Sequence, residues 1–250
     1  MAGHSKWANR LHRKSRQDAK KGKVFGKLSR EIIVAARLGG ADPAANNRLR
    51  LAIQAAKAAR MPSDNIERAI KRGSGEADGE SYDEVVYEGF GPGNVYLMLG
   101  CLTDNRQRTV SEVRNILDRH GGTLADAGSV AYLFERKGLV VVAKGDGMDS
   151  EQLFLEAAEA GAEDVRDEGD YFEITTDAND LAAVLERLNA AGITEERAEL
   201  TYVPKVTQPV PDEQARKLLN LLELLDEHDD VQRVYSNFEV SDAVLAALEN

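Results

Sequence analysis

The sequence has almost no cysteine and no long apolar run. Its one cysteine, Cys101, has no second cysteine with which to form an internal disulfide. No apolar stretch approaches the roughly 18 residues that a membrane-spanning helix needs. The charged start, MAGHSKWANRLHRKS, lacks the apolar centre of a secretory signal. These absences argue against a disulfide-stabilised secreted protein and predict a cytoplasmic one.

The patterns of common catalytic and metal sites are also missing. The histidines do not form a metal-ligand spacing with the lone cysteine; they are His4, His12, His120 and His228. The segment GFGPG, residues 89–93, has no G-K-[ST] and precedes a predicted strand, so it predicts a tight hairpin rather than a phosphate loop. Cys101 lies in an apolar run, which favours a buried side chain. We expect no enzyme activity, no cofactor and no metal.

Charge of the two signs is strongly segregated along the chain. Residues 1–73 contain 18 lysines and arginines against 5 acidic residues, a balance of +13, whereas residues 74–250 carry a balance of −24. This asymmetry predicts that the basic part contacts a nucleic acid. The acidic remainder is expected to stay off the phosphates and to offer a surface to a protein partner. Its dense acids at 149–170 and 223–230 predict a solvated face rather than paired catalytic carboxylates.

Hydrophobic periodicity and composition divide the 250 residues into predicted domains of an α+β protein. These are a basic arm plus helical bundle (1–77), a discontinuous α/β domain (78–137 with 205–240), an inserted ferredoxin-like domain (138–204) and a C-terminal tail (241–250). The Gly-, Ser- and acid-rich residues 73–81 mark the first boundary.

The basic part predicts an arm followed by three helices. Residues 1–27 hold nine cations and one acid, and are expected to form an extended or mobile arm. A first helix is expected from Leu28 until Gly39. Asp42 is expected to cap a second helix that ends near Arg60. A D-x-x-E motif that begins at Asp64 is expected to open a third helix.

The acidic part predicts mainly strands. Strands are expected at 85–87, 95–102 and 130–134, with a helix over 106–119. The order β-α-β-β-α-β is predicted for 138–203, with strands near 139–143, 164–167, 171–175 and 198–203 and helices over 150–160 and 178–190. An amphipathic helix near 215–225 and a strand at 231–235 are too little to stand alone. We expect this last stretch to complete the sheet of residues 82–136.

Four segments resemble the YebC family. They are GHSKWANRLHRKSRQDAKKGKVFGKLSREI, MPSDNIERAIKRG, YEGFGPGNVYLMLGCLTDNRQRTVSEVRN and GGTLADAGSVAYLF. The resemblance covers almost the whole chain and implies a helical N-terminal domain followed by two α/β domains. It also implies a DNA-binding, probable transcriptional regulator. The family includes a mitochondrial translational activator of cytochrome c oxidase, so the alternative is a ribosome-associated factor that contacts ribosomal RNA and relieves stalling, for example at proline runs.

Cations of the arm and bundle are candidate nucleic-acid contacts, because Lys and Arg neutralise phosphates and release counterions. The candidate nucleic-acid-binding residues are these cations and one aromatic residue: Lys6, Trp7, Arg10, Arg13, Lys14, Arg16, Lys20, Lys21, Lys23, Lys27, Arg30, Arg48, Arg50 and Lys57. Trp7 could stack on an unpaired base or dock on its own domain. Six to nine contacts on duplex DNA predict a slope of log K against log salt of roughly −5 to −8.

A second candidate lies at the start of the 106–119 helix. Cations at a helix N-terminus oppose the helix dipole and tend to need an anion, so Arg106 and Arg108 form a candidate anion site for a phosphate or carboxylate. The favoured alternative is that Asp104 caps the helix and pairs with one of the two arginines.

Overall fold

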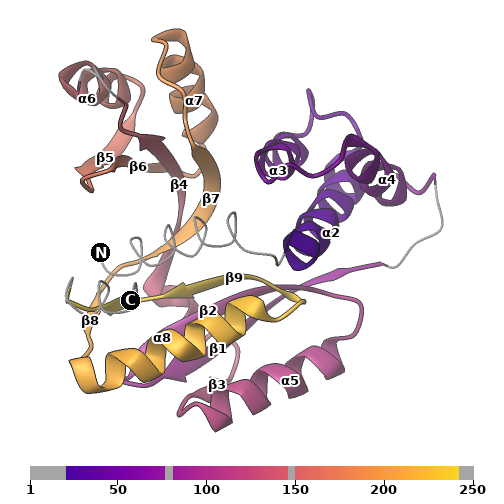
Figure 1. The fold of residues 1–250 in the computed structure, drawn as a ribbon, viewed down its shortest axis with the longest axis vertical. Helices are drawn as coiled ribbons and strands as arrows, with labels where there is room; N and C mark the ends of the chain where they lie inside the picture. The colour runs from indigo at the N-terminus through magenta and orange to yellow at the C-terminus, as the bar shows by residue number, and fades with distance from the viewer. Residues whose placement is uncertain (1–20, 77–80, 146–149, 242–250) are drawn as a thin grey trace. The chain divides into compact units, whose positions relative to one another are not determined.

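The computed structural model of the chain describes residues 21–76, 81–145 and 150–241. Two compact units make up the backbone, one formed by residues 1–133 with 204–250 and the other by residues 134–203. Both units contain helices and mainly antiparallel sheets, so the protein belongs to the α+β class (Figure 1). Across the described ranges, no helix is long and apolar enough to cross a bilayer.

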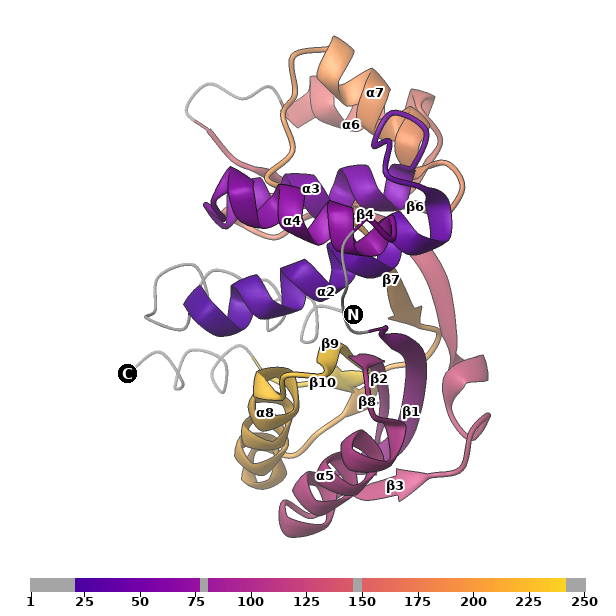
Figure 2. The same cartoon turned by 90° about the vertical axis from the view of Figure 1, so that its right-hand side faces the viewer.

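The first unit begins with a bundle of three helices, α2 (Lys21–Gly39), α3 (Asn47–Ala58) and α4 (Ser63–Gly73). Helix α2 packs against both of the others (Figure 2). The bundle core is apolar and includes Ile32, Leu49 and Ile66. A Cβ atom on Gly73 would lie 2.4 Å from the Ile33 carbonyl oxygen, so glycine is needed for the close approach of α4 to α2.

Three expectations about this bundle are wrong in detail. Residues 21–27 are helical rather than extended, because Phe25 and Leu28 pack against the bundle core. Asp42 does not cap α3; it closes a turn by accepting from the Ala44 N–H at 2.9 Å. Helix α4 begins at Ser63 after Pro62, whose fixed φ sets the chain direction, and Asp64 lies within the first turn.

A four-stranded antiparallel sheet follows, in the order β3-β1-β2-β9. Its strands are β1 (Asp83–Gly91), β2 (Val95–Thr103), β3 (Thr123–Ala125) and β9 (Val231–Ser236). Helices α5 (Arg106–Arg119) and α8 (Asp212–Glu227) lie side by side on one face of the sheet (Figure 1). Leucines of β2, α5 and α8 form the core beneath them. The segment that follows the second unit therefore completes this sheet, as the amphipathic pattern predicts.

The turn between β1 and β2 confirms the predicted hairpin. The strands pair from Asp83 opposite Thr103 to Gly91 opposite Val95. Gly93 and Asn94 have φ values of 80° and 58°, which Gly and Asn adopt at low cost. The strand predicted at 130–134 is wrong, because Ala131–Leu133 form a 3₁₀ turn, η1. The three-residue strand β3 is too short to show periodicity in the sequence.

The second unit has the predicted ferredoxin-like order. It comprises β4 (Phe134–Ala143), α6 (Ser150–Glu159), β5 (Ala162–Asp167), β6 (Tyr171–Asp177), α7 (Leu181–Ala190) and β7 (Arg197–Pro204). Its sheet has the order β5-β6-β4-β7. Val140 and Val142 of β4 pair with Ile174 and Phe172 of β6, and all four are fully buried.

The chain leaves and re-enters the first unit at adjacent points, because the Lys205 N–H donates to the Leu133 carbonyl at 2.8 Å. A short parallel pair, β8 (Gln208–Pro209) with β10 (Phe238–Glu239), follows the return. The division of the first unit into a bundle domain and a sheet domain stays a prediction.

Candidate nucleic-acid interface

Half of the predicted nucleic-acid-binding residues lie outside the described residues. These are Lys6, Trp7, Arg10, Arg13, Lys14, Arg16 and Lys20. Lys21 is the first residue of α2. The other six candidates, Lys23, Lys27, Arg30, Arg48, Arg50 and Lys57, lie on α2 and α3. The structure divides these six into cations with partners inside the protein and cations on the surface.

Three cations of α2 contact the C-terminal end of α8. Lys23, Lys27 and Arg30 recur at i, i+4 and i+7, so they share one face of α2. Lys23 Nζ donates to the Glu227 carbonyl at 3.3 Å, and Lys27 Nζ donates to the Asp226 carbonyl. The α8 carbonyls without partners in their own helix are thus met by cations from α2.

The turn after α8 continues this contact through Arg30. Its guanidinium donates to the Asp229 carbonyl and lies 3.7 Å from Oδ1 of Asp230. The expectation of a solvated acidic face is therefore wrong for Asp230, which is buried, and for Asp226, which is partly buried, whereas the Asp229 side chain is exposed. A signal for this was present, because α8 ends with Asp226 and Glu227 and no cation in its last turn. Acids there oppose the helix dipole, which favours a cation supplied from elsewhere.

Lys27 and Asp226 form a poorly solvated pair. Lys27 Nζ lies 4.0 Å from Asp226 Oδ1, and the side chains are 17% and 33% exposed. Burial lowers the pKa of Lys27, and burial raises the pKa of Asp226. Because both shifts reflect lost hydration, this lysine is a partner of α8 rather than a solvent-facing charge.

Arg48 is held between two carboxylates. Its guanidinium donates to Glu31 on α2 at 2.7 Å and to Glu84 on β1 at 2.7 Å, with a second contact to each. Although burial opposes it, hydrogen bonding to Glu31 and Glu84 raises the Arg48 pKa above its usual value. Arg48 therefore ties α3 to α2 and to the sheet. Arg37 on α2 also has internal partners, because its guanidinium donates to the Ser81 hydroxyl and to the Tyr82 carbonyl. We use the name paired set for the five cations with such partners, which are Lys23, Lys27, Arg30, Arg37 and Arg48.

A second group of bundle cations faces solvent. Its members are Arg50, Lys57, Arg60, Lys71 and Arg72, and we call them the outward set. All five are exposed. Within the described residues, none of their side chains forms a hydrogen bond or an ion pair. Arg68 is also exposed, but its guanidinium bonds the Asp64 carbonyl and the Asn65 side chain on its own helix.

The candidate anion site at α5 contains carboxylates of the protein itself. Arg106 Nε lies 2.9 Å from Asp83, and Arg108 contacts Asp104 at 2.6 Å and Asp230 at 2.9 Å. The pairing of Asp104 with one arginine is as predicted, but the cap is Asn105, whose side chain accepts from the Arg108 N–H at 3.0 Å. A role of these arginines toward an external anion stays a prediction.

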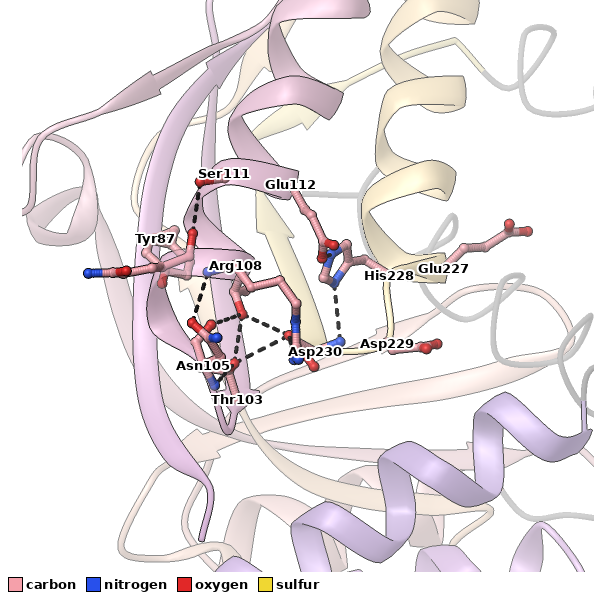
Figure 3. A network of polar contacts seen from close by, with 12 residues as sticks. Tyr87, Thr103, Asn105, Arg108, Ser111, Glu112, Glu227, His228, Asp229 and Asp230 are labelled. Carbon is pink, nitrogen blue, oxygen red and sulfur yellow. Dashed lines mark hydrogen bonds and ion pairs between the residues drawn. The ribbon is translucent and has the colours of Figure 1, made fainter. Parts of the chain in front are cut away.

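Asp230 is the centre of a buried polar network (Figure 3). It is 2% exposed, and its Oδ2 accepts from the Thr109 hydroxyl at 2.7 Å and from Arg108 at 2.9 Å. Burial by itself would raise the Asp230 pKa, but the hydrogen bonds from Thr109 and Arg108 hold it below its usual value. Sequence reasoning missed Asp230, because Arg108 and Thr109 lie more than a hundred positions away from it in the chain.

One trio in the described ranges, Glu112, His228 and Asp230, brings ligand atoms within 4.8 Å of one another. The hydrogen bonds of Figure 3 account for the arrangement. His228 Nδ1 accepts from the Asp230 N–H at 3.1 Å, so Nε2 carries the proton and donates to Glu112 at 2.9 Å. His228 and His120 are the C-cap residues of α8 and α5.

These features define an α+β protein with a cationic helical bundle, a sheet completed by a distant segment and an inserted ferredoxin-like unit. A family model described as "TACO1/YebC protein N-terminal domain" matches residues 5–76, and one described as "TACO1/YebC second and third domain" matches residues 82–238. The chain belongs to the TACO1/YebC family, as the sequence resemblance predicts.

Two relatives are closely similar over almost their whole length. A protein of Persephonella marina is 54% identical over 247 residues, which cover 98% of each chain. One of Carboxydothermus hydrogenoformans is 53% identical over 244 residues, 97% of this chain and all of the relative. Both are named "Probable transcriptional regulatory protein". The crystal structure of a conserved hypothetical protein from Aquifex aeolicus is 49% identical, with a TM-score of 0.83 over 90% of this chain and 92% of that one.

Proposed function

We propose that the protein binds nucleic acid through its basic N-terminal part and acts as a DNA-binding transcriptional regulator. The observation that carries this proposal is the charge segregation, +13 over residues 1–73 against −24 over the remainder. The names of the two bacterial relatives, which describe probable transcriptional regulatory proteins, agree with it.

The physical basis is the phosphate backbone. Cations that neutralise phosphates release condensed counterions, which gives affinity without base selectivity. The acidic residues beyond position 73 repel the same phosphates, so the protein approaches a strand with its bundle first. A regulator of this kind works by occupying its site, and it needs no catalytic group.

The alternative partner is ribosomal RNA, because its phosphates present the same charge to the same cations. The family resemblance implies a translation factor as the alternative function. Crosslinking in cells, followed by sequencing of the attached nucleic acid, separates the two functions. Recovery of promoter fragments would support the regulator, whereas recovery of ribosomal RNA would replace it with the translation factor.

A binding assay tests the shared premise. Changing Lys20 and Lys21 together to Glu is expected to weaken binding to a DNA duplex and to purified ribosomes at physiological salt. The control changes Arg114 on α5 and Arg216 on α8 together to Glu, which is the same change of charge at two exposed cations of the acidic part. Undiminished binding of the Lys20 and Lys21 variant to every nucleic acid would remove this segment from the contact.

A further inference from the structure

The outward set and the paired set differ in whether their side chains bond polar groups of the protein. Each cation of the paired set bonds a carboxylate, a carbonyl or a hydroxyl of the protein. Within the described residues, the outward set has no such partner and remains hydrated. A hydrated cation can exchange its water and counterions for a phosphate without first breaking a contact inside the protein.

Arg60 has an unusual backbone conformation. It lies in the left-handed region with φ of 61°, directly after Ala59, the C-cap of α3. The Arg60 N–H bonds the Lys57 carbonyl at 2.9 Å, and the Met61 N–H bonds the Ala56 carbonyl at 2.9 Å. This is the Schellman ending of a helix, in which glycine is the usual residue at the left-handed position. An arginine there is strained relative to glycine, and among the described residues its exposed side chain forms no hydrogen bond or ion pair that would compensate for the strain.

A favourable interaction with the helix dipole explains why some members of the outward set are cations, but not all of them. Lys57 lies in the last turn of α3, and Lys71 and Arg72 lie in the last turn of α4, where cations stabilise a helix. Arg50 is different, because it lies near the N-terminal end of α3, where no acid occupies the first turn. The dipole therefore does not account for Arg50. Position 60 lies just beyond the C-terminal end of α3, where the dipole also favours a cation, although glycine would avoid the left-handed strain.

We propose that the cations of the outward set contact nucleic-acid phosphates, with Arg60 as a direct phosphate contact, while the paired set holds the fold together. This inference rests on the proposed function and narrows it to named side chains. It removes Lys23, Lys27, Arg30 and Arg48 from the candidate phosphate contacts, and it adds Arg60, Lys71 and Arg72.

The test compares two full-length variants with equal charge change. In the first, the five outward cations are changed to Gln. In the second, Gln replaces five exposed cations of the acidic part, which are Arg114, Arg119, Arg136, Arg216 and Lys217. Circular dichroism checks the fold of each. Binding to a labelled DNA duplex and to a labelled ribosomal RNA fragment is then measured over a range of salt concentrations.

The first variant is expected to lose roughly 10³-fold in duplex affinity near physiological salt, and its salt slope should be shallower by about 4.5. The second variant should change the slope by less than about 0.9, the value of one contact. Equal losses in the two variants, or no loss in the first, would overturn the inference. If the unmodified protein binds neither probe, the proposed function itself fails, which is a distinct result.

A single substitution tests Arg60. Arg60→Gly relieves the left-handed strain and removes the charge, so the midpoint of thermal unfolding should rise while duplex affinity falls roughly fivefold near physiological salt. Arg60→Lys keeps the charge and the strain, and should retain most of the affinity. A gain in stability with unchanged affinity for Arg60→Gly would show that Arg60 is not a contact.

Discussion

Glu88 is a charged residue whose burial has a local explanation. It is 5% exposed, and its carboxylate accepts from the N–H groups of Val130 at 2.6 Å, Gly128 at 2.7 Å and Ala131 at 2.9 Å. Burial by itself would raise the Glu88 pKa, but these three donors outweigh it and lower that pKa below its usual value. One side chain of β1 therefore fixes the loop before β4.

Glu88→Gln should lower the free energy of unfolding by about 2 kcal/mol at neutral pH, because the amide nitrogen cannot accept from these donors. The carboxylate has a lower pKa in the folded state than in the unfolded state. Its contribution is therefore complete above the unfolded pKa of about 4.3 and is lost as pH falls through the folded value. Urea unfolding across acidic pH should show a smaller pH dependence for Glu88→Gln than for the unmodified protein.

Glu186→Gln is the matched control for Glu88→Gln, because Glu186 is an exposed acid on α7. It should change the free energy of unfolding by less than about 0.5 kcal/mol. An equal loss in the two variants would contradict the role assigned to the Glu88 hydrogen bonds.

Cys101 gives a second prediction for a single residue. It is 3% exposed, and burial raises the pKa of its thiol to about 12. Because the thiolate is the reactive form, a soluble disulfide reagent should leave the folded protein unmodified near pH 8 and should react fully in denaturant. Rapid modification without denaturant would mean that the β2 core opens readily.

Secondary-structure elements meet through a few polar side chains, of which Asn46 is the clearest. It is 6% exposed and caps α3 by accepting from the Leu49 N–H at 3.1 Å. Its amide nitrogen also donates to the carbonyls of Ala35 and Gly40, each at 2.8 Å. Asn46 therefore joins the end of α2 to the start of α3.

Replacing Asn46 should destabilise the bundle. Asn46→Ala removes the cap and leaves two carbonyls without their donor, so we expect a loss of about 2 kcal/mol or more. Asn46→Asp keeps the cap but brings a carboxylate against the same two carbonyls, so it should not restore stability. Thermal unfolding measures both variants, and full stability of Asn46→Asp would show that the two donor contacts contribute little.

At the scale of the whole molecule, the second unit is an uninterrupted insertion. Residues 134–203 form their own sheet and two helices, and the chain enters and leaves at hydrogen-bonded neighbours. A segment of this length with its own core lies near the lower end of domain size.

The fragment 134–203 is expected to fold by itself. It should show the circular dichroism of mixed helix and sheet and a cooperative urea transition, because β4, β6, α6 and α7 all supply buried apolar side chains. Leu153→Ala is a control within the fragment, since it removes a fully buried side chain and should cost about 2 to 5 kcal/mol. A non-cooperative transition of the parent fragment would show that the unit depends on the rest of the chain.

Much of the fold follows from local patterns. The helix expected over 106–119 is observed at those bounds, and the β-α-β-β-α-β order is correct, because apolar residues at helical or strand spacing identify elements wherever one face is buried. Helix ends were less predictable. Asp42 and Asn46 are both good caps by residue type, and only the packing of α3 against α2 selects Asn46.

The sequence by itself determined the segregation of charge, since the net charge of a segment depends only on the residues that the segment contains. Tertiary structure decided which cations are free to bind. Lys27 and Lys57 are alike in the sequence, yet Lys27 contacts Asp226, 199 positions away, whereas Lys57 faces water. The reason is physical: a cation is available to an external phosphate only if no internal anion or carbonyl already offsets its charge, and that depends on which segments folding brings together.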